Sequence, residues 1–335
     1  MKSKLLSVFF IFFIIELAFS QNDPDIYSNN PNFRWVLVNN SSHEVVITFK
    51  NNKEFKLDPY GGYRWFSPIW LVNTMEYRAE SSNTSSYSFV WTNFPTGRRY
   101  WSYNFYDPNR VIQVWNGPIA IFYNKENRQI NSRLNRIPLV QQAANSNYCG
   151  IACLQMVENY YFSRSNSLDN IWREISSTSS LGRIVGKTYL MGKYVKNNNL
   201  FSSVVRFSDL SRILYYCEAF QIPAIMNVRS SANSSLGHYI VFAGYDPETG
   251  LVRVKDPNYI NIVTYNYSDL EYLFTKLNAN DEIGGNIIIL PSDKMIIQKN
   301  THCIYCNYVN TVDELIIDAI SGLICINCDS FFQVQ

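Results

Sequence analysis

The sequence predicts an α+β protein made of an all-β region, a domain that mixes helix and strand patterns, and a short cysteine-rich tail. Three observations indicate this class. Short strand-like runs separated by turn residues fill the region from about Asn32 to Gly117. An amphipathic helical pattern begins at Cys149, and strand patterns follow it. Two Cys-x-x-Cys pairs lie close to the carboxyl end. The length of 335 residues fits about two domains.

The first segment has the character of a secretory signal peptide. Two lysines precede an apolar run from Leu5 to Phe19, and Ala18-Phe19-Ser20 has the small-x-small pattern of a cleavage site. The run is too short for an ordinary membrane-spanning helix. We therefore expect residues 1–20 to be removed, leaving no stable membrane span. The mature glycoprotein would be secreted or would lie in an endomembrane lumen, for example a lysosome-like or vacuolar compartment.

The region 21–120 is expected to be a β-sandwich-like domain rich in aromatic residues. It holds six of the seven tryptophans, and its runs include "RWVLV", "EVVITF", "EFKLD", "SYSFVW", "YWSYNFY" and "RVIQVW". These rings could bind a glycan or a protein ligand, although packing in a sandwich core explains most of them. The net charge of +2 gives no general attraction to nucleic acid, so we expect no nucleic-acid partner. A polar linker, 121–136, follows.

Cys149 lies where a helix is expected to begin. Good N-cap residues precede it, namely Asn145, Ser146 and Asn147. Apolar residues then recur at helical spacing: Cys149, Ala152, Cys153, Met156, Val157 and Tyr160. The amino end of a helix favours an anion, so a thiol there can become a reactive thiolate. Gly150 beside it would let another backbone or a substrate approach. The alternative is an ordinary core cysteine, which suits Cys153 well.

A nucleophilic cysteine needs a base, and the chain has three histidines. His238 lies in "GHYIVFAGYDPETGLVRVKDPN", which predicts a β-hairpin. If Tyr245 pairs with Leu251, His238 lies opposite Asn258, and Asp256 is its diagonal neighbour. If the turn is shorter by one pair of residues, His238 lies directly opposite Asp256. Both registers keep the two side chains on one face, within about 5–8 Å. Asp256 would then orient the imidazole, as in a triad.

Two glutamines, Gln141 and Gln142, precede the cysteine. A side-chain amide there can donate to the oxyanion of an acyl-transfer intermediate. Such a glutamine is more often a solvated loop residue.

The segments "IPLVQQAANSNYCGIACLQMVENYY", "GHYIVFAGYD" and "VRVKDPN" together resemble the thirty-ninth family of cysteine peptidases. These are papain-like domains that process double-glycine leader peptides in bacteriocin exporters, together with free-standing relatives. The resemblance covers about Ile137 to Pro291, and we assign the domain to 137–292. It implies a helix carrying the nucleophile packed on an antiparallel sheet, and catalysis without a cofactor.

The same resemblance implies the roles of four residues: Cys149 as nucleophile, His238 as base, Asp256 as its orienter, and Gln142 in the oxyanion hole. Two positions depart from the family pattern. Ile151 stands where proline is usual, and Gln142 stands seven residues before the cysteine, where six is commoner. The sequence does not carry the exporters' transmembrane and ATP-hydrolysing domains, so cleavage after double glycine is not expected.

The tail, 293–335, holds four cysteines in two Cys-x-x-Cys pairs: Cys303 and Cys306, then Cys325 and Cys328. This spacing predicts a zinc-ribbon-like site with four thiolate ligands. An oxidising compartment favours two disulfides instead. Both alternatives make the tail a structural module.

The leading hypothesis is a secreted cysteine peptidase or amide hydrolase acting on a peptide or protein substrate. The alternative is a non-catalytic secreted binding protein, which uses the aromatic β domain and carries a degenerate hydrolase domain. Acyl transfer to an amine, rather than to water, is a third possibility on the same triad.

Overall fold

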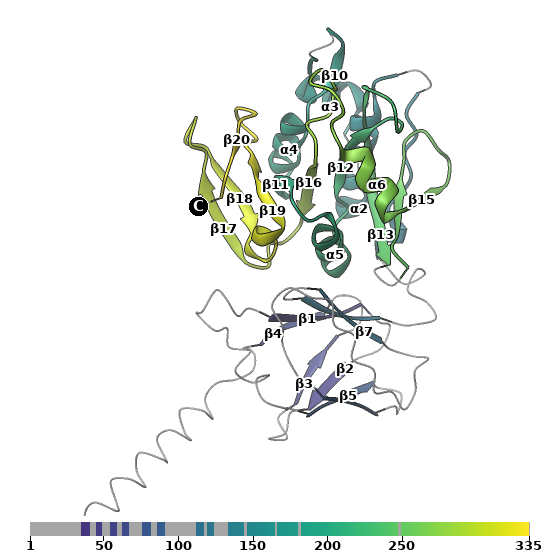
Figure 1. The fold of residues 1–335 in the computed structure, drawn as a ribbon, viewed down its shortest axis with the longest axis vertical. Helices are drawn as coiled ribbons and strands as arrows, with labels where there is room; N and C mark the ends of the chain where they lie inside the picture. The colour runs from purple at the N-terminus through teal and green to yellow at the C-terminus, as the bar shows by residue number, and fades with distance from the viewer. Residues whose placement is uncertain are drawn as a thin grey trace, which may run out of the picture. The chain divides into compact units, whose positions relative to one another are not determined.

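A computed structural model describes residues 35–40, 45–48, 54–58, 62–66, 76–81, 86–90, 112–116, 119–123, 133–143, 146–164, 166–179, 182–246 and 249–334. The chain divides into two compact units, Met1–Arg128 and Gln129–Gln335 (Figure 1). The expected signal peptide and the run "YWSYNFY" lie outside the described residues, and so does His43, another of the three histidines.

The described part of the first unit is all β. One sheet has the order β4 (Gly62–Phe66), β1 (Trp35–Asn39), β8 (Ile119–Tyr123), β7 (Ile112–Asn116). The other has the order β3 (Glu54–Leu57), β2 (Val45–Thr48), β5 (Glu76–Ser81), β6 (Ser86–Val90). Neighbouring strands run antiparallel, except β1 and β8, which are parallel.

Alternate residues of neighbouring strands form a core in this unit. Val36 lies opposite Ile119 and Val38 opposite Ile121, and all four are buried. Because alternate side chains point to one face of a strand, this is the buried face of its sheet. The buried Asn39 amide donates to the carbonyl of Leu57 in the other sheet, at 2.9 Å. The face-to-face sandwich itself stays a prediction.

The second unit is built on one antiparallel eight-stranded sheet. Its strands have the order β15 (Ile262–Asn266), β14 (Leu251–Lys255), β13 (Gly237–Asp246), β12 (Ile225–Arg229), β16 (Ile287–Ser292), β11 (Phe201–Phe207), β19 (Ile320–Ile324), β20 (Phe331–Phe332). Short ribbons pair β9 (Ser176–Thr178) with β10 (Ile184–Gly186), and β17 (Gln298–His302) with β18 (Val309–Asp313). β12 and β16 are buried along their whole length, as central strands of a covered sheet are.

Five α-helices accompany this sheet: α2 (Cys149–Phe162), α3 (Leu168–Ile175), α4 (Thr188–Asn197), α5 (Leu210–Phe220) and α6 (Tyr267–Phe274). α2 packs against β13, α4 against β11 and β16, α5 against β13, and α6 against β12. The mixture of helix and antiparallel sheet agrees with the expected α+β class and with a helix packed on an antiparallel sheet. α2 and β13, which carry Cys149 and His238, are in direct contact.

The expected linker and the expected tail both contain residues that form part of the adjoining domains. β8 extends to Tyr123, and the short 3-10 helix η3 (Arg133–Arg136) inserts the fully buried Leu134 into the second unit. The tail strands β19 and β20 extend the central sheet, so the expected separate module shares the sheet and its core with the hydrolase-like domain (yellow in Figure 1). A second 3-10 helix, η4 (Glu314–Ala319), packs against α5.

A buried carboxylate fastens the tail to this core. Asp313 accepts a hydrogen bond from the Tyr216 hydroxyl of α5 at 3.0 Å and another from the Ile296 N–H at 2.7 Å. Loss of the tail would leave the Tyr216 hydroxyl without this partner, and one edge of β11 would be exposed.

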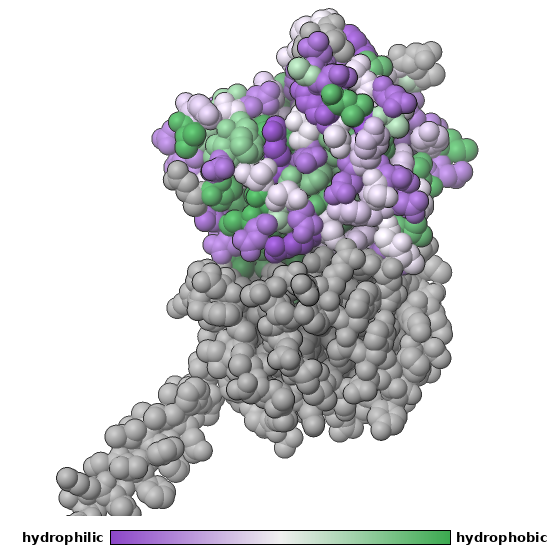
Figure 2. All heavy atoms as spheres, viewed as in Figure 1, coloured by the Kyte–Doolittle hydropathy of each residue, from purple (hydrophilic) through white to green (hydrophobic). Residues whose placement is uncertain are grey.

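The surface of the second unit mixes polar and apolar residues, as the surfaces of globular proteins commonly do. Hydrophilic and hydrophobic residues are interspersed over the face drawn in Figure 2. Within the described ranges, no helix combines the length and the apolar character that crossing a bilayer requires.

Candidate active site and cysteine cluster

Cys149 is the first residue of α2, where the apolar pattern predicts the helix to begin. Its side chain is partly exposed, whereas Cys153, one turn later, is fully buried. Burial raises the pKa of the Cys153 thiol well above its ordinary value, and the nearby charges of Cys149 and Asp256 add to this effect. Cys153 is therefore held as a neutral core thiol, and Cys149 is the accessible one.

Ser146 and Asn147 do not cap α2, and Asn145 lies outside the described residues. Tyr148 occupies the N-cap position and makes no side-chain hydrogen bond to the helix. Ser146 donates to the carbonyl of Ala143, and Asn147 donates to that of Ile184. These side chains instead hold the loop that leads into the helix. The first N–H groups of α2, beside Cys149, are thus not occupied by a capping side chain.

At Gly150 it is neither a substrate nor another backbone that approaches closely, but two side chains. A Cβ built on it would lie 3.1 Å from Sδ of Met191 and 3.4 Å from Cδ2 of Tyr239. The small residue is needed because α2 approaches these side chains closely. Ile151, which replaces the usual proline, is fully buried in the core.

His238 and Asp256 are in direct contact. His238 is the second residue of β13, and Asp256 directly follows β14. Nε2 of His238 lies 2.8 Å from Oδ1 of Asp256, and the two residues are 6% and 3% exposed. The thiol of Cys149 lies close enough to the His238 imidazole to raise the pKa of the ring.

At the turn of the hairpin, the pairing of β13 with β14 differs from both of the registers that the sequence suggests. Asp246, not Tyr245, lies opposite Leu251. A bulge between Phe242 and Gly244 then takes up one residue.

Beyond the bulge, Phe242 pairs with Val254 and Val241 with Lys255. These are the partners that the Tyr245–Leu251 pairing predicts. The expected pairing is one residue off at the turn, and the bulge shifts the register back by one residue. The expected register is therefore restored before the strand reaches His238.

Electrostatics in this cluster favours a charged imidazole. Burial alone would lower the pKa of His238. The hydrogen bonds to Asp256 and Cys149, together with the charges of the same two groups, outweigh burial and raise the pKa to about 9. A proton on His238 is therefore held more firmly than on an ordinary histidine.

Gln142 lies beside this cluster, but its amide faces an unexpected partner. Its Nε2 donates to Oδ1 of Asn258 at 2.5 Å, and its backbone N–H donates to the carbonyl of Pro257 at 3.1 Å. The neighbouring Gln141 is exposed. The loop before α2 is thus fastened to the loop that follows Asp256.

Asn258 is a site residue whose role the sequence did not indicate. Its backbone N–H donates to Oδ1 of Asp256 at 2.9 Å, and its Nδ2 lies 3.4 Å from Nε2 of His238. With the bond from Gln142, it links the expected oxyanion donor to the His–Asp pair. The available signal was its position in the Asp-Pro-Asn turn opposite His238.

The four tail cysteines converge on one point. Their sulfurs all lie within 4.8 Å of one another, and this is the group of metal-ligating side chains found in the described part of the chain. Sγ of Cys303 lies 3.7 Å from that of Cys328, and Sγ of Cys306 lies 3.6 Å from that of Cys325. Tetrahedral zinc with bonds of about 2.3 Å places its sulfurs about 3.8 Å apart. A disulfide needs about 2 Å.

The backbone forms the same turn around each cysteine pair. The N–H of Asn307 donates to the carbonyl of Cys303 at 2.8 Å, and that of Asp329 donates to Cys325 at 3.0 Å. Asn307 and Asp329 have φ of 58° and 64°, a conformation that Asn and Asp tolerate better than most residues. Two matching turns that present four thiols to one point fit a metal site with four thiolate ligands.

One comparison with known proteins supports the domain assignment. Residues 134–278 match the model of the Peptidase_C39 like family. The matched segment contains Gln142, Cys149, His238 and Asp256. No curated protein matches the chain. The motifs, the helix on an antiparallel sheet and the family match agree, and residues 134–278 form a peptidase C39-like domain.

Proposed function

We propose that this chain is a secreted cysteine peptidase or amide hydrolase. Its family supports a cysteine peptidase-type function. The observation that carries the proposal is the hydrogen bond between His238 and the buried Asp256, beside the Cys149 thiol, which helps to raise the pKa of the imidazole.

In the proposed reaction, the Cys149 thiolate attacks the carbonyl carbon of an amide. The oxyanion receives hydrogen bonds from the Cys149 backbone N–H and from the second N–H of the Gln142 amide. The imidazolium of His238 gives its proton to the departing amine, and a thioester remains on Cys149. His238 then takes a proton from water, whose oxygen attacks the thioester and releases the acid and the thiolate. Asp256 keeps the ring oriented and stabilises its charge.

The four-cysteine cluster is proposed to hold a structural zinc ion through Cys303, Cys306, Cys325 and Cys328. The reaction requires no cofactor. A bound zinc would cross-link the tail and the edge of the central sheet and would take no part in bond cleavage. A glycan or protein ligand for the aromatic β domain remains a separate proposal.

The hydrolase proposal is tested with the purified protein and a mixture of unstructured peptides. We expect new peptide termini to be found by mass spectrometry with the native chain and none with Cys149→Ser. Binding of the peptides without cleavage by the native chain would contradict the proposal and favour a binding protein.

Replacing Gln142 by alanine is expected to slow acylation of the protein by p-nitrophenyl acetate by about a hundredfold. Alkylation of Cys149 by iodoacetamide should change little, because it passes through no oxyanion. Gln141→Ala is the matched control, since that side chain is exposed, and it should leave both rates unchanged. Equal losses in acylation and alkylation for Gln142→Ala would show that Gln142 only holds the loop.

A further inference from the structure

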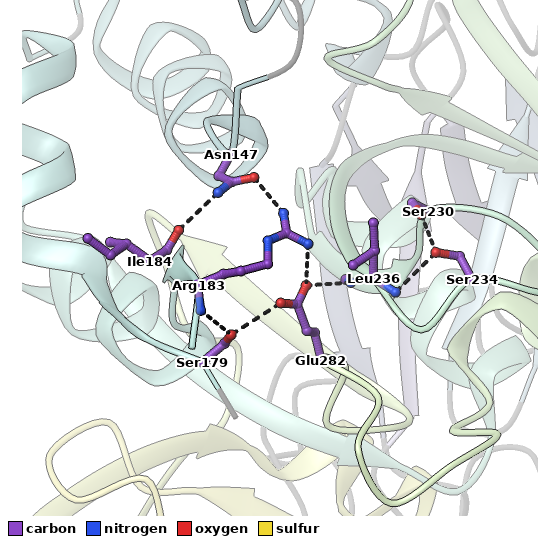
Figure 3. Close-up of polar contacts among 9 residues, drawn as sticks. Asn147, Ser179, Arg183, Ile184, Ser230, Ser234, Leu236 and Glu282 are labelled. Carbon is purple, nitrogen blue, oxygen red and sulfur yellow. Dashed lines mark hydrogen bonds and ion pairs between the residues drawn. The ribbon is translucent and has the colours of Figure 1, made fainter. Parts of the chain in front are cut away.

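A buried carboxylate, Glu282, lies outside the catalytic cluster and contacts the segments around it. It belongs to the loop between α6 and β16, and its side chain is 5% exposed. Oε2 accepts a hydrogen bond from the N–H of Gly237 at 3.2 Å, and Oε1 accepts one from the hydroxyl of Ser179 at 3.2 Å. The Arg183 guanidinium lies 3.7 Å from Oε2 (Figure 3).

The network continues from Arg183 to the start of α2. Nη2 of Arg183 donates to Oδ1 of Asn147 at 2.7 Å, and Nδ2 of Asn147 donates to the carbonyl of Ile184 at 3.1 Å (Figure 3). Asn147 stands two residues before Cys149. At the other end, Gly237 directly precedes His238. One polar network therefore ends beside both the nucleophile and the base.

The loop that carries Glu282 is itself fixed. The Glu282 N–H donates to the carbonyl of Ser235 at 2.9 Å. Next to it, Oδ2 of Asp281 accepts the N–H groups of Leu277 and Asn278 at 2.7 and 3.0 Å. A Cβ on Gly237 would lie 3.4 Å from Cβ of Glu282, so strand and loop are in close contact. The carboxylate is thus presented from a rigid frame.

We propose that Glu282, together with Arg183, is a positioning residue of the site, which sets the placement of Cys149 relative to His238. Burying a carboxylate costs free energy unless it is paired and hydrogen-bonded. Here one partner, Gly237, directly precedes His238, and another, Arg183, bonds to Asn147 just before Cys149. Small displacements of reacting groups carry large rate penalties. The inference rests on the proposed function and deepens it.

The test measures the rate of Cys149 alkylation by iodoacetamide at pH 7 and at pH 10, with the site identified by mass spectrometry. An unassisted thiol reacts at pH 7 with only a few hundredths of its fully ionised rate, whereas a thiolate paired with an imidazolium keeps most of it. The ratio of the two rates therefore reports on the Cys–His pair. Global stability does not enter this ratio as long as the protein stays folded.

Glu282→Ala is expected to lower this ratio by about tenfold, toward the value of His238→Ala. Glu282→Gln retains an oxygen that can accept the Gly237 N–H and should lower the ratio less. Glu271→Gln is the matched control, because Glu271 is an exposed glutamate of α6 bonded to Tyr267, and it should leave the ratio unchanged. The buried Cys153 and Cys217 serve as folding sensors, since they are alkylated only if the chain opens.

The outcomes separate the two hypotheses. A native ratio no higher than that of His238→Ala would overturn the proposed function, and the positioning role with it. A high native ratio that survives in Glu282→Ala, with the buried cysteines protected, would overturn the positioning role alone. If Cys153 is alkylated in Glu282→Ala, that variant has opened and its ratio is not informative. If Cys153 stays protected in Glu282→Gln, the ratio of Glu282→Gln then decides. An unchanged ratio in that variant contradicts the proposal.

Discussion

Replacing His238 by alanine is expected to reduce peptide hydrolysis by about a hundredfold to ten-thousandfold. The substitution removes the group that donates to the leaving amine and later accepts a proton from water. His302→Ala is the matched control, since His302 is the exposed histidine of the tail and makes no contact that we assign to catalysis. A loss of similar size in both variants would contradict the assignment of His238.

The pH dependence of the same assay follows from the sign of the pKa shift. The pKa of His238 is raised to about 9, so the imidazolium persists through neutral pH and disappears as pH rises through that value. Hydrolysis should therefore decline above about pH 9. Asp256→Asn removes a charge that raises this pKa, so its decline should begin at lower pH. An unchanged alkaline limb in Asp256→Asn would contradict the proposed role of Asp256.

Removal of zinc is expected to have the largest effect on stability. Structural zinc sites contribute about 10–16 kcal/mol of apparent binding free energy in small peptides. Because the tail extends the central sheet, its release should destabilise the second unit as a whole. We expect one zinc per chain by elemental analysis. A strong chelator should lower the unfolding temperature by about 10 °C or more.

Cys325→Ser tests the same point by mutation and should lose both the metal and this stability. Cys149→Ser, a change of a cysteine outside the cluster, should retain both. The disulfide alternative makes the opposite prediction. A protein without zinc, resistant to chelator and destabilised by a reductant, would contradict the metal site.

Local patterns were sufficient to predict several features. The apolar spacing after Cys149 predicts α2 because every turn of a helix repeats the same face. The Cys-x-x-Cys spacing predicts the convergence of four sulfurs because each pair lies in one short turn. The order of glutamine, cysteine, histidine and aspartate was enough to indicate the family.

The bulge in β13 has a signal in the sequence, which is a glycine inside the strand pattern. Gly244 lies inside a strand pattern, and a glycine there often marks a bulge. Its φ of 147° is one that other residues seldom adopt, and a Cβ on it would collide with the Arg253 guanidinium. Its position could therefore have indicated the bulge, although not the pairing of Asp246 with Leu251 at the turn.

Other features depend on contacts between distant segments and leave little trace in the sequence. β19 pairs with β11 across more than a hundred residues, so the tail looked like a separate module. Glu282 and Arg183 are ordinary charged loop residues until the fold brings them together. Asn147 is of a residue type that is favoured at N-caps, but its side chain forms hydrogen bonds with Ile184 and Arg183 instead.

Cys149 is proposed to hydrolyse an amide bond through a thioester. The most direct test of this role is the peptide digestion carried out in heavy-oxygen water, with Cys149→Ser run in parallel. Our account predicts products whose new carboxyl groups carry the heavy oxygen, formed by the native chain and not by the variant. Products joined to an added amine, without heavy oxygen, would indicate acyl transfer. Cleavage that persists in Cys149→Ser, or no cleavage by the native chain, would contradict the account.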